Sequence, residues 1–202
     1  CVFTAGYLGN VSLITSKKIS SEIISSPLGV YIFGEECDGY ADLAKRYYNG
    51  LDEQLKAPFT LGLGSDKGHG DSGYDNKKYP QKEMAREYFY YFKDKKGAFT
   101  IPITDIIPEK YMPLYFLGMG FGIYEETNHQ TADSVREINT LPIEWTYKRY
   151  IYAGLAIHSP DNKENISLSV IRAFPNFREI KNVVEMIGDD GLKKKVNSIW
   201  SN

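Results

Sequence analysis

The pattern of apolar positions along the chain predicts strands in six segments. They are residues 11–15, 30–35, 59–63, 114–124, 145–157 and 166–174. Some of these segments alternate apolar and polar residues, and the others are continuous runs of β-branched and aromatic residues. Both patterns are typical of strands. The last two segments flank the polar stretch 159–164, so we expect them to pair as a hairpin.

A second hairpin is predicted where two aromatic-rich segments flank a short polar linker. Residues 87–92 and 98–103 lie on either side of the sequence Lys-Asp-Lys-Lys-Gly at positions 93–97. A five-residue linker that ends in glycine is typical of a hairpin loop. A helix over residues 81–92 is the alternative interpretation of the first segment.

Alternating glycines distinguish the segment 114–124. Gly118, Gly120 and Gly122 are separated by larger apolar residues. On a strand, alternate residues point to the same face, so we expect the three glycines to share one face. Such a face allows another backbone or a large aromatic ring to approach closely.

Apolar residues at spacings of three and four predict helices near the middle and the end of the chain. They are residues 40–56, 177–187 and 192–200, with a shorter helix within 127–139. Gly50 is an unfavourable interior residue for the first helix, and Pro58 is expected to end it. Strands outnumber helices, and no repeat or linker divides the sequence. We therefore expect a single domain, residues 1–202, with an α+β fold: a largely antiparallel β-sheet with a few helices packed on one face.

Composition excludes several classes of protein. The chain has 202 residues, of which 42% are hydrophobic and 25% charged, and its formal net charge is -2. These values are typical of a folded globular protein and not of a disordered one. A charge near zero argues against a nucleic-acid partner. No apolar run approaches the length of a transmembrane helix. The 16 tyrosines suit either strand packing or a binding surface.

No sequence motif for catalysis is present. The three histidines, His69, His129 and His158, have no metal-ligand spacing, and we expect His129 in a solvated loop and His158 at a strand end. Cys37 lies beside acidic residues, which would raise the pKa of its thiol and so disfavour a reactive thiolate. We therefore predict no catalytic residue, no cofactor and no metal. A catalytic triad assembled in space stays open as an alternative.

A long polar loop is predicted between residues 64 and 79. It contains four glycines and the residues Asp66, His69, Asp71, Tyr74 and Asp75. A loop of this length in a compact domain is usually functional. Its aspartates suggest calcium, but their spacing matches no EF-hand and the neighbouring lysines dilute the charge. We expect these five residues to contact a partner instead.

The chain begins at Cys1, with no methionine before it. A sequence that starts in this way resembles a mature bacterial lipoprotein, in which the signal peptide is cut immediately before a lipid-bearing cysteine. The resemblance implies lipid attachment at Cys1. Val2, where an aspartate would favour the inner membrane, implies the periplasmic face of the outer membrane. Residues 9–16 and 34–37, followed by a helix, also resemble small bacterial envelope lipoproteins. A secreted domain with a disulfide between Cys1 and Cys37 is the alternative.

In its size, its inferred cellular location and its lack of a catalytic motif, the chain resembles immunity lipoproteins, which protect bacteria against toxins that act in the periplasm. The resemblance implies a non-catalytic, lipid-anchored binding protein that neutralises a partner protein such as a secreted antibacterial toxin or enzyme. It implies no nucleic-acid partner. Two alternatives stay open: an accessory or structural lipoprotein of a secretion or surface assembly, and an envelope hydrolase.

Overall fold

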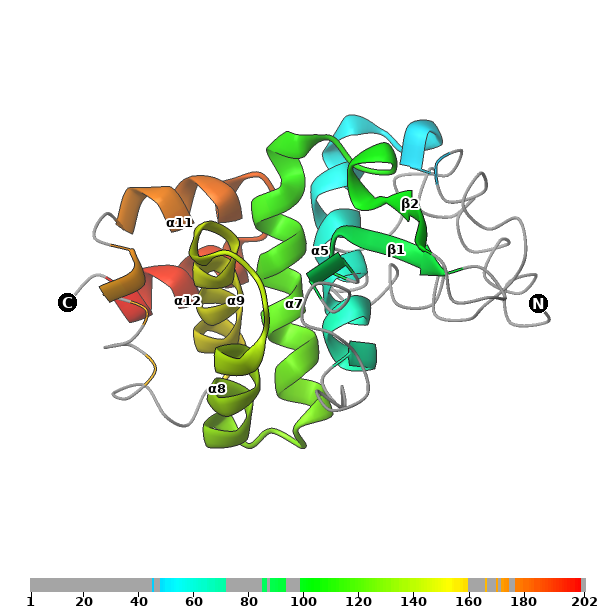
Figure 1. Cartoon of the computed structure of the whole chain (residues 1–202). Coiled ribbons are helices and arrows are strands. Elements are labelled where there is room, and N and C mark those ends of the chain that lie inside the picture. The colour runs from blue at the N-terminus through cyan, green and yellow to red at the C-terminus, as the bar shows by residue number, and fades with distance from the viewer. Residues whose placement is uncertain are drawn as a thin grey trace.

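Helices dominate the part of the chain that the computed structural model describes, namely residues 45, 48–71, 85–86, 88–93, 99–159, 166, 170, 172–174 and 177–200. The helices are α5 (Glu53–Asp71), α7 (Met112–Glu126), α8 (Thr131–Thr140), α9 (Trp145–His158), α11 (Phe177–Glu185) and α12 (Asp190–Trp200). Two short 3₁₀ helices, η1 (Ile103–Asp105) and η2 (Glu109–Tyr111), precede α7. Within the same residues one antiparallel pair of strands occurs, β1 (Tyr90–Lys93) and β2 (Phe99–Pro102) (Figure 1).

The expected α+β fold with a largely antiparallel sheet is wrong for this part of the chain. Residues 59–63, 114–124 and 145–157, all predicted as strands, are helical and belong to α5, α7 and α9. The described positions within 166–174 are also helical, except residue 174. A continuous apolar run is shared by buried strands and buried helices, so periodicity alone does not separate them. The hairpin predicted around 159–164 is therefore wrong as well.

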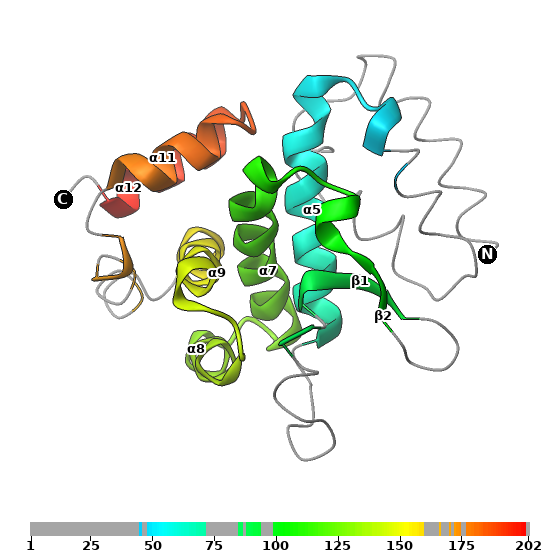
Figure 2. The same ribbon diagram turned by 45° about the horizontal axis from the view of Figure 1, so that its top comes forward.

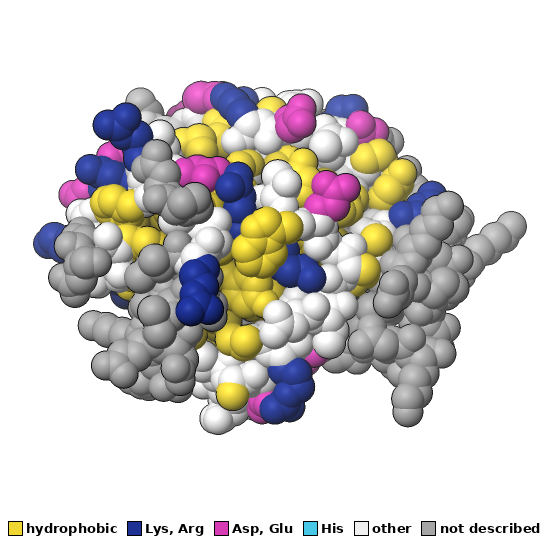
Figure 3. Space-filling view, turned by 60° about the vertical axis from the view of Figure 1, so that its left-hand side comes forward, with side chains coloured by type: hydrophobic (Ala, Val, Ile, Leu, Met, Phe, Trp, Pro, Cys, Tyr) yellow, Lys and Arg dark blue, Asp and Glu magenta, His cyan; other side chains and the backbone are white. Residues whose placement is uncertain are grey.

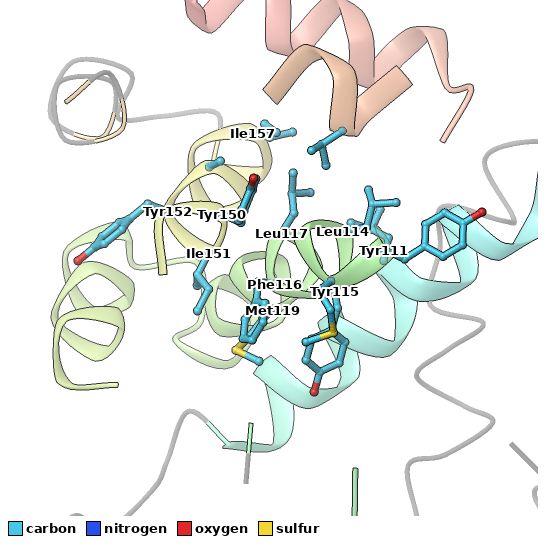
Figure 4. Packing of buried hydrophobic residues seen from close by; sticks show 14 of the residues in the cluster. Tyr111, Leu114, Tyr115, Phe116, Leu117, Met119, Tyr150, Ile151, Tyr152 and Ile157 are labelled. Carbon is cyan, nitrogen blue, oxygen red and sulfur yellow. The ribbon is translucent and has the colours of Figure 1, made fainter. Parts of the chain in front are cut away.

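Helix α7 is the centre of the core, with α5 on one side and α9 on the other (Figures 1 and 2). Because neighbours cover it on both sides, α7 is apolar nearly all round. Phe116 and Leu117 are fully buried, and the Phe116 ring packs at 4.7 Å, centroid to centroid, from Tyr147 of α9. Figure 4 shows these α7 side chains beside Ile151 and Ile157 of α9.

Glycines allow α5 and α7 to pack backbone to backbone. Gly64 and Gly68 of α5 lie against the backbone of Tyr115 and Met119, and Gly118 of α7 lies against Leu61. A β-carbon at any of these glycines would overlap a carbonyl oxygen of the opposite helix. From Gly64 to Gly68 the contact on α7 moves from Tyr115 to Met119, and from Leu61 to Ser65 it moves from Gly118 to Gly122. Helices α5 and α7 therefore run in the same direction. The close backbone approach expected from the glycines is confirmed, but on a helix and not on a strand.

The opposite side of α7 packs against α9 in the same way. Gly120 of α7 lies against the backbone of Ile151 and Leu155, and Gly154 of α9 lies against Leu117. Gly118 and Gly122 therefore face α5, whereas Gly120 faces α9. This is the arrangement that a helix of 3.6 residues per turn gives to alternate positions. Phe116 packs on Tyr147 and Phe121 on His158, so α9 runs in the same direction as α7, and three parallel helices pack closely with α7 in the middle.

Pro58 does not end a helix, contrary to expectation; it lies inside α5. The chain is helical at residues 48–50, breaks at Leu51 and Asp52, and starts α5 at Glu53. Pro58 is the sixth residue of α5, so its missing amide removes one hydrogen bond, the one to the carbonyl oxygen of Gln54 in the first turn. The hydroxyl of Thr60 donates to the carbonyl oxygen of Lys56 at 2.8 Å.

The remaining helix predictions and one hairpin are confirmed. Helices α8, α11 and α12 lie within or close to the predicted ranges and bury their apolar stripes. Gly188, with a φ of 75°, lies between α11 and α12, in the predicted break. Strands β1 and β2 pair Tyr90 with Pro102. Residues 88–89, just before β1, are helical, so the alternative helix is correct for that part. Segments 11–15 and 30–35 lie outside the described residues.

A cluster of ionic hydrogen bonds ties the start of α5 to the start of α7. One oxygen of Glu53, Oε1, accepts hydrogen bonds from Lys110 Nζ and from the Tyr111 hydroxyl, both at 2.9 Å. Its other oxygen accepts one from Lys56 at 2.9 Å. The hydrogen bonds from Lys110, Lys56 and Tyr111 lower the pKa of Glu53 to about 2.

Among the described helices, none is long and apolar enough to cross a membrane.

Candidate functional site

All three histidines of the chain lie at one end of the three-helix core. His69 is in the last turn of α5, His158 is the last residue of α9, and His129 lies in the connection between α7 and α8. The last two residues of α7 are Glu125 and Glu126. Because α5, α7 and α9 run in the same direction, their carboxyl-terminal ends meet at this end of the molecule (Figure 1). We call these five residues the acid–imidazole end.

Each imidazole faces a carboxylate. His158 Nε2 lies 2.7 Å from Glu125 Oε1, and His129 Nε2 lies 3.9 Å from Glu125 Oε2. A single carboxylate therefore lies between two imidazoles that come from different elements. On the other side of α7, His69 Nδ1 lies 3.3 Å from Glu126 Oε2. The five side chains are between 33% and 61% exposed, so they are accessible to another molecule.

Aromatic rings hold two of the imidazoles in place. The His158 ring stacks on Phe121 at 4.8 Å with an interplanar angle of 17°, and its edge meets Tyr124 at 5.7 Å. The His129 ring meets the same Tyr124 at 5.0 Å. Tyr124 is buried, so one anchored ring orients both histidines around Glu125.

The backbone that carries His129 is strained. Asn128 and His129 both have left-handed conformations, with φ values of 51° and 63°. Left-handed conformations are uncommon for residues other than glycine, although asparagine and histidine adopt them more readily than most. The amide of His129 donates to the carbonyl oxygen of Tyr124 at 2.9 Å, and the amide of Asn128 donates to that of Glu125 at 3.0 Å. These bonds satisfy carbonyls at the end of α7 and turn His129 back toward it.

Paired hydroxyls brace the same end. Thr127 Oγ1 and Ser134 Oγ are 2.7 Å apart and join the end of α7 to α8. Thr131 Oγ1 and Ser159 Oγ are 2.8 Å apart, both buried, and join α8 to the end of α9. In the described part of the chain the hydrogen bonds of these hydroxyls go to each other or to carbonyl oxygens, whereas the imidazoles face carboxylates. The hydroxyls therefore form a rigid frame around the charged groups.

The location of the site sets its electrostatics. The carboxyl-terminal end of a helix carries a partial negative charge, equivalent to roughly half a unit. Three such ends meet here and add to the two glutamates, so the end is negative while the imidazoles are neutral. The imidazoles provide hydrogen bonds and, when protonated, positive charge. Among the residues described, no three His, Cys, Asp or Glu side chains are arranged to hold a metal ion.

Only part of the predicted partner-binding loop can be located. Residues 64–71 are helical, so Asp66, His69 and Asp71 lie on α5 and not in a loop. Of these, the side chain of His69 is described, and it reaches Glu126. Tyr74 and Asp75 lie outside the described residues, as do Cys1 and Cys37.

The sequence interpretation missed the two glutamates and placed His129 and His158 in unrelated structures. His158 ends a helix, not a strand, and His129 lies in an exposed connection, as expected, but pairs with Glu125. The signal was present, because Glu125 and His129 are four residues apart at the end of an apolar run. It was lost because the preceding segment 114–124 was predicted as a strand, so no helix was expected to end at these glutamates.

Exposed hydrophobic residues offer a second surface. Trp145 and Met186 are the exposed large hydrophobic residues of the described part, at 56% and 38%. Figure 3 shows the side of the molecule formed by α8, α9, α11 and α12, with hydrophobic side chains among charges of both signs. This mixed surface favours no particular ligand chemistry.

Comparisons with known proteins give no relative: no family model matches the chain, and neither a curated protein nor a solved structure matches it significantly.

Proposed function

We propose that this chain is a non-catalytic binding protein that neutralises a partner protein in the bacterial cell envelope. The observation that carries the proposal is the gathering of all three histidines and two glutamates, exposed, at the ends of three tightly packed helices. The envelope address and the lipid at Cys1 rest on the resemblance to mature lipoproteins and belong to the same proposal.

The arrangement suits binding more than catalysis. Binding groups recognise a partner best when rigid elements hold them, and here the glycine contacts and the hydroxyl pairs fix the helix ends. A nucleophilic mechanism requires a hydroxyl or thiol within hydrogen-bond reach of the base. Thr127 is close to His129 in sequence and Ser159 follows His158, but their hydroxyls are hydrogen-bonded to Ser134 and Thr131 instead.

Capture from the native host, followed by measurement on purified proteins, tests the proposal. The chain without acyl groups is used as bait, and the captured protein is purified and titrated calorimetrically against it. We expect a stoichiometric complex that inhibits the activity of the partner. We expect the double variant Glu125→Gln/Glu126→Gln to bind at least about tenfold more weakly, because it removes both carboxylates of the site.

A matched control removes two exposed carboxylates elsewhere. Asp105 and Glu109 lie in η1 and η2, before the start of α7 and therefore at the opposite end of the core. The variant Asp105→Asn/Glu109→Gln changes the net charge equally and should bind as the wild type does. A partner that is bound but not inhibited, or one whose affinity is the same for both double variants, would contradict the proposal.

A general-base hydrolase is the second candidate, and the 2.7 Å contact between His158 Nε2 and Glu125 Oε1 favours it. A carboxylate that orients a histidine is the usual base unit of hydrolytic enzymes, acting either on a nucleophile or on water. The wild type would then hydrolyse members of a panel of carboxylic esters, phosphodiesters and peptidoglycan fragments. His158→Gln would abolish that activity without changing the melting temperature. Activity retained in His158→Gln would exclude this candidate.

A further inference from the structure

Each of the three histidines of the chain faces one of two adjacent carboxylates, those of Glu125 and Glu126. We infer that the acid–imidazole end binds a positively charged segment of its partner, one that carries Arg or Lys, and releases it on acidification. This inference deepens the proposed function by naming the partner's chemistry and the control on binding. It rests on the contacts of Glu125 and Glu126 with the three imidazoles.

The charged groups around the site come from every element that meets there. On these elements the charged residues are Asp66, Lys67, His69 and Asp71 of α5, Glu125 and Glu126 of α7, His129 of the following connection, Asp133 and Arg136 of α8, and His158 of α9; the side chains of Asp66 and Asp71 lie outside the described ones. Asp133 and Arg136 pair with each other at 3.0 Å, so their charges offset one another. With neutral imidazoles, the carboxylates of Glu125 and Glu126 and the three helix ends make this end negative. A negative surface attracts a cationic partner and repels an anionic one.

Acidification changes the charge of the imidazoles that face the two glutamates. Histidine is the ordinary side chain that changes charge between about pH 5 and pH 8. When all three imidazoles are protonated, three positive charges face the two glutamates and offset the negative charge of this end. The surface then attracts Arg or Lys much less.

Competition for the Glu125 carboxylate reinforces this change. His158 already lies on Oε1 and His129 lies near Oε2. A protonated imidazole forms a stronger, charge-assisted hydrogen bond with a carboxylate than a neutral one does. Protonation therefore engages both oxygens of Glu125 within the molecule, and an incoming guanidinium or ammonium group loses its acceptor. His69 acts in the same way on Glu126.

A defined peptide tests the inference without the natural partner. The probe is an acetylated and amidated hexa-arginine peptide that carries a fluorophore, titrated with the full chain by anisotropy at roughly 150 mM salt. We expect binding at about pH 7.5 and at least roughly tenfold weaker binding at about pH 5.5. The chain has no histidine outside the site, so a variant that replaces these three removes every imidazole of the chain.

Two variants test the carboxylates and the histidines separately, and a third variant is the control for the change in net charge. Glu125→Gln/Glu126→Gln should bind the peptide at least about tenfold more weakly at pH 7.5, whereas Asp105→Asn/Glu109→Gln should not. His69→Gln/His129→Gln/His158→Gln should bind at pH 7.5 and keep that affinity, within about twofold, at pH 5.5. Circular dichroism and thermal melting confirm that each variant is folded, which the exposure of the replaced side chains favours.

The outcomes distinguish this inference from the proposed function. Equal binding of the peptide by the wild type and by the Glu125/Glu126 variant overturns it, and so does a pH dependence that persists without the histidines. A captured inhibitory complex that is insensitive to acid would leave the proposed function standing and overturn the inference. Peptide binding with the expected pH dependence, but with no partner captured, would do the reverse.

Discussion

Gly118 of α7 lies against Leu61 of α5 so closely that a β-carbon on the glycine would overlap the carbonyl oxygen of the leucine. Neighbouring contacts repeat this relationship along the helix pair, with Gly64 against Tyr115 and Gly68 against Met119. The helices therefore touch through backbone atoms. Backbone atoms move less readily than side chains, so these positions tolerate no larger residue.

The first prediction concerns this contact. Gly118→Ala should lower the free energy of unfolding by about 3 kcal/mol or more, because the two helices must separate to admit the methyl group. Denaturation by urea measures the loss. Gly50→Ala is the control, since Gly50 is helical and a methyl group there would have nothing within 4 Å. That change should be neutral or raise stability by up to about 1 kcal/mol. Equal effects of the two substitutions would contradict this packing.

The second prediction concerns the link between α9 and α11. Arg149 Nη2 and the hydroxyl of Tyr150 both donate to Glu179 Oε1 at 2.6 Å. Burial, followed by the hydrogen bond and the charge of Glu179, raises the pKa of Tyr150 to about 12. An unfolded tyrosine ionises near 10, so the unfolded state loses its proton first as the pH rises. The stability that Tyr150 contributes is thus present below about pH 10 and lost between pH 10 and 12.

Tyr150→Phe tests this link. The substitution should cost about 1 kcal/mol near neutral pH, because it removes one hydrogen bond to a partly exposed carboxylate. It should also remove part of the fall in stability between about pH 10 and pH 12. Unfolding measured across this range gives both results. Tyr147→Phe is a control of the same chemistry on the same helix. An alkaline profile unchanged in Tyr150→Phe would show that the Tyr150–Glu179 hydrogen bond does not form in solution.

The third prediction concerns acid. The pKa of Glu53, lowered to about 2 by its hydrogen bonds, is below that of an unfolded glutamate, so the folded state holds its proton less tightly. Its contribution to stability is present above about pH 4.5 and is lost as the pH falls toward 2. Glu53→Gln should reduce the acid sensitivity of folding in that interval, whereas Glu109→Gln should not. Unfolding followed from pH 5 downward compares the two variants, and identical profiles would refute the prediction.

The sequence predicted amphipathic helices well and buried helices poorly. Residues 177–187 show an apolar stripe on an otherwise polar segment, and α11 forms there with Ile180, Val183 and Val184 buried. Helix α7 has no such stripe, because α5 and α9 cover it on both sides. Its continuous apolar run was interpreted as a strand for that reason. The predicted segment 114–124 is 11 residues long, longer than most strands, and this length favours a helix.

The candidate site depended on tertiary structure in the same way. His69 and Glu126 are far apart in sequence, and only the parallel packing of α5 and α7 brings them to 3.3 Å. His158 reaches Glu125 because α9 ends level with α7. No local pattern reports such an alignment. Only the spacing of Glu125 and His129, four residues apart, carried local information about the site.

The last prediction concerns the strain beside the site. Asn128 and His129 are both left-handed, and glycine adopts this conformation without a steric cost. His129→Gly should therefore raise the free energy of unfolding by up to about 1 kcal/mol, whereas His129→Ala should lower it, although both remove the same imidazole. Urea denaturation of the two variants measures the difference. Both should lose part of the acid-induced release of the hexa-arginine peptide, because Glu125 then faces His158 alone. Strain retained at a histidine that contacts a carboxylate is the expected cost of a functional position. A His129→Gly protein that is no more stable than His129→Ala would show that the strain is absent in solution.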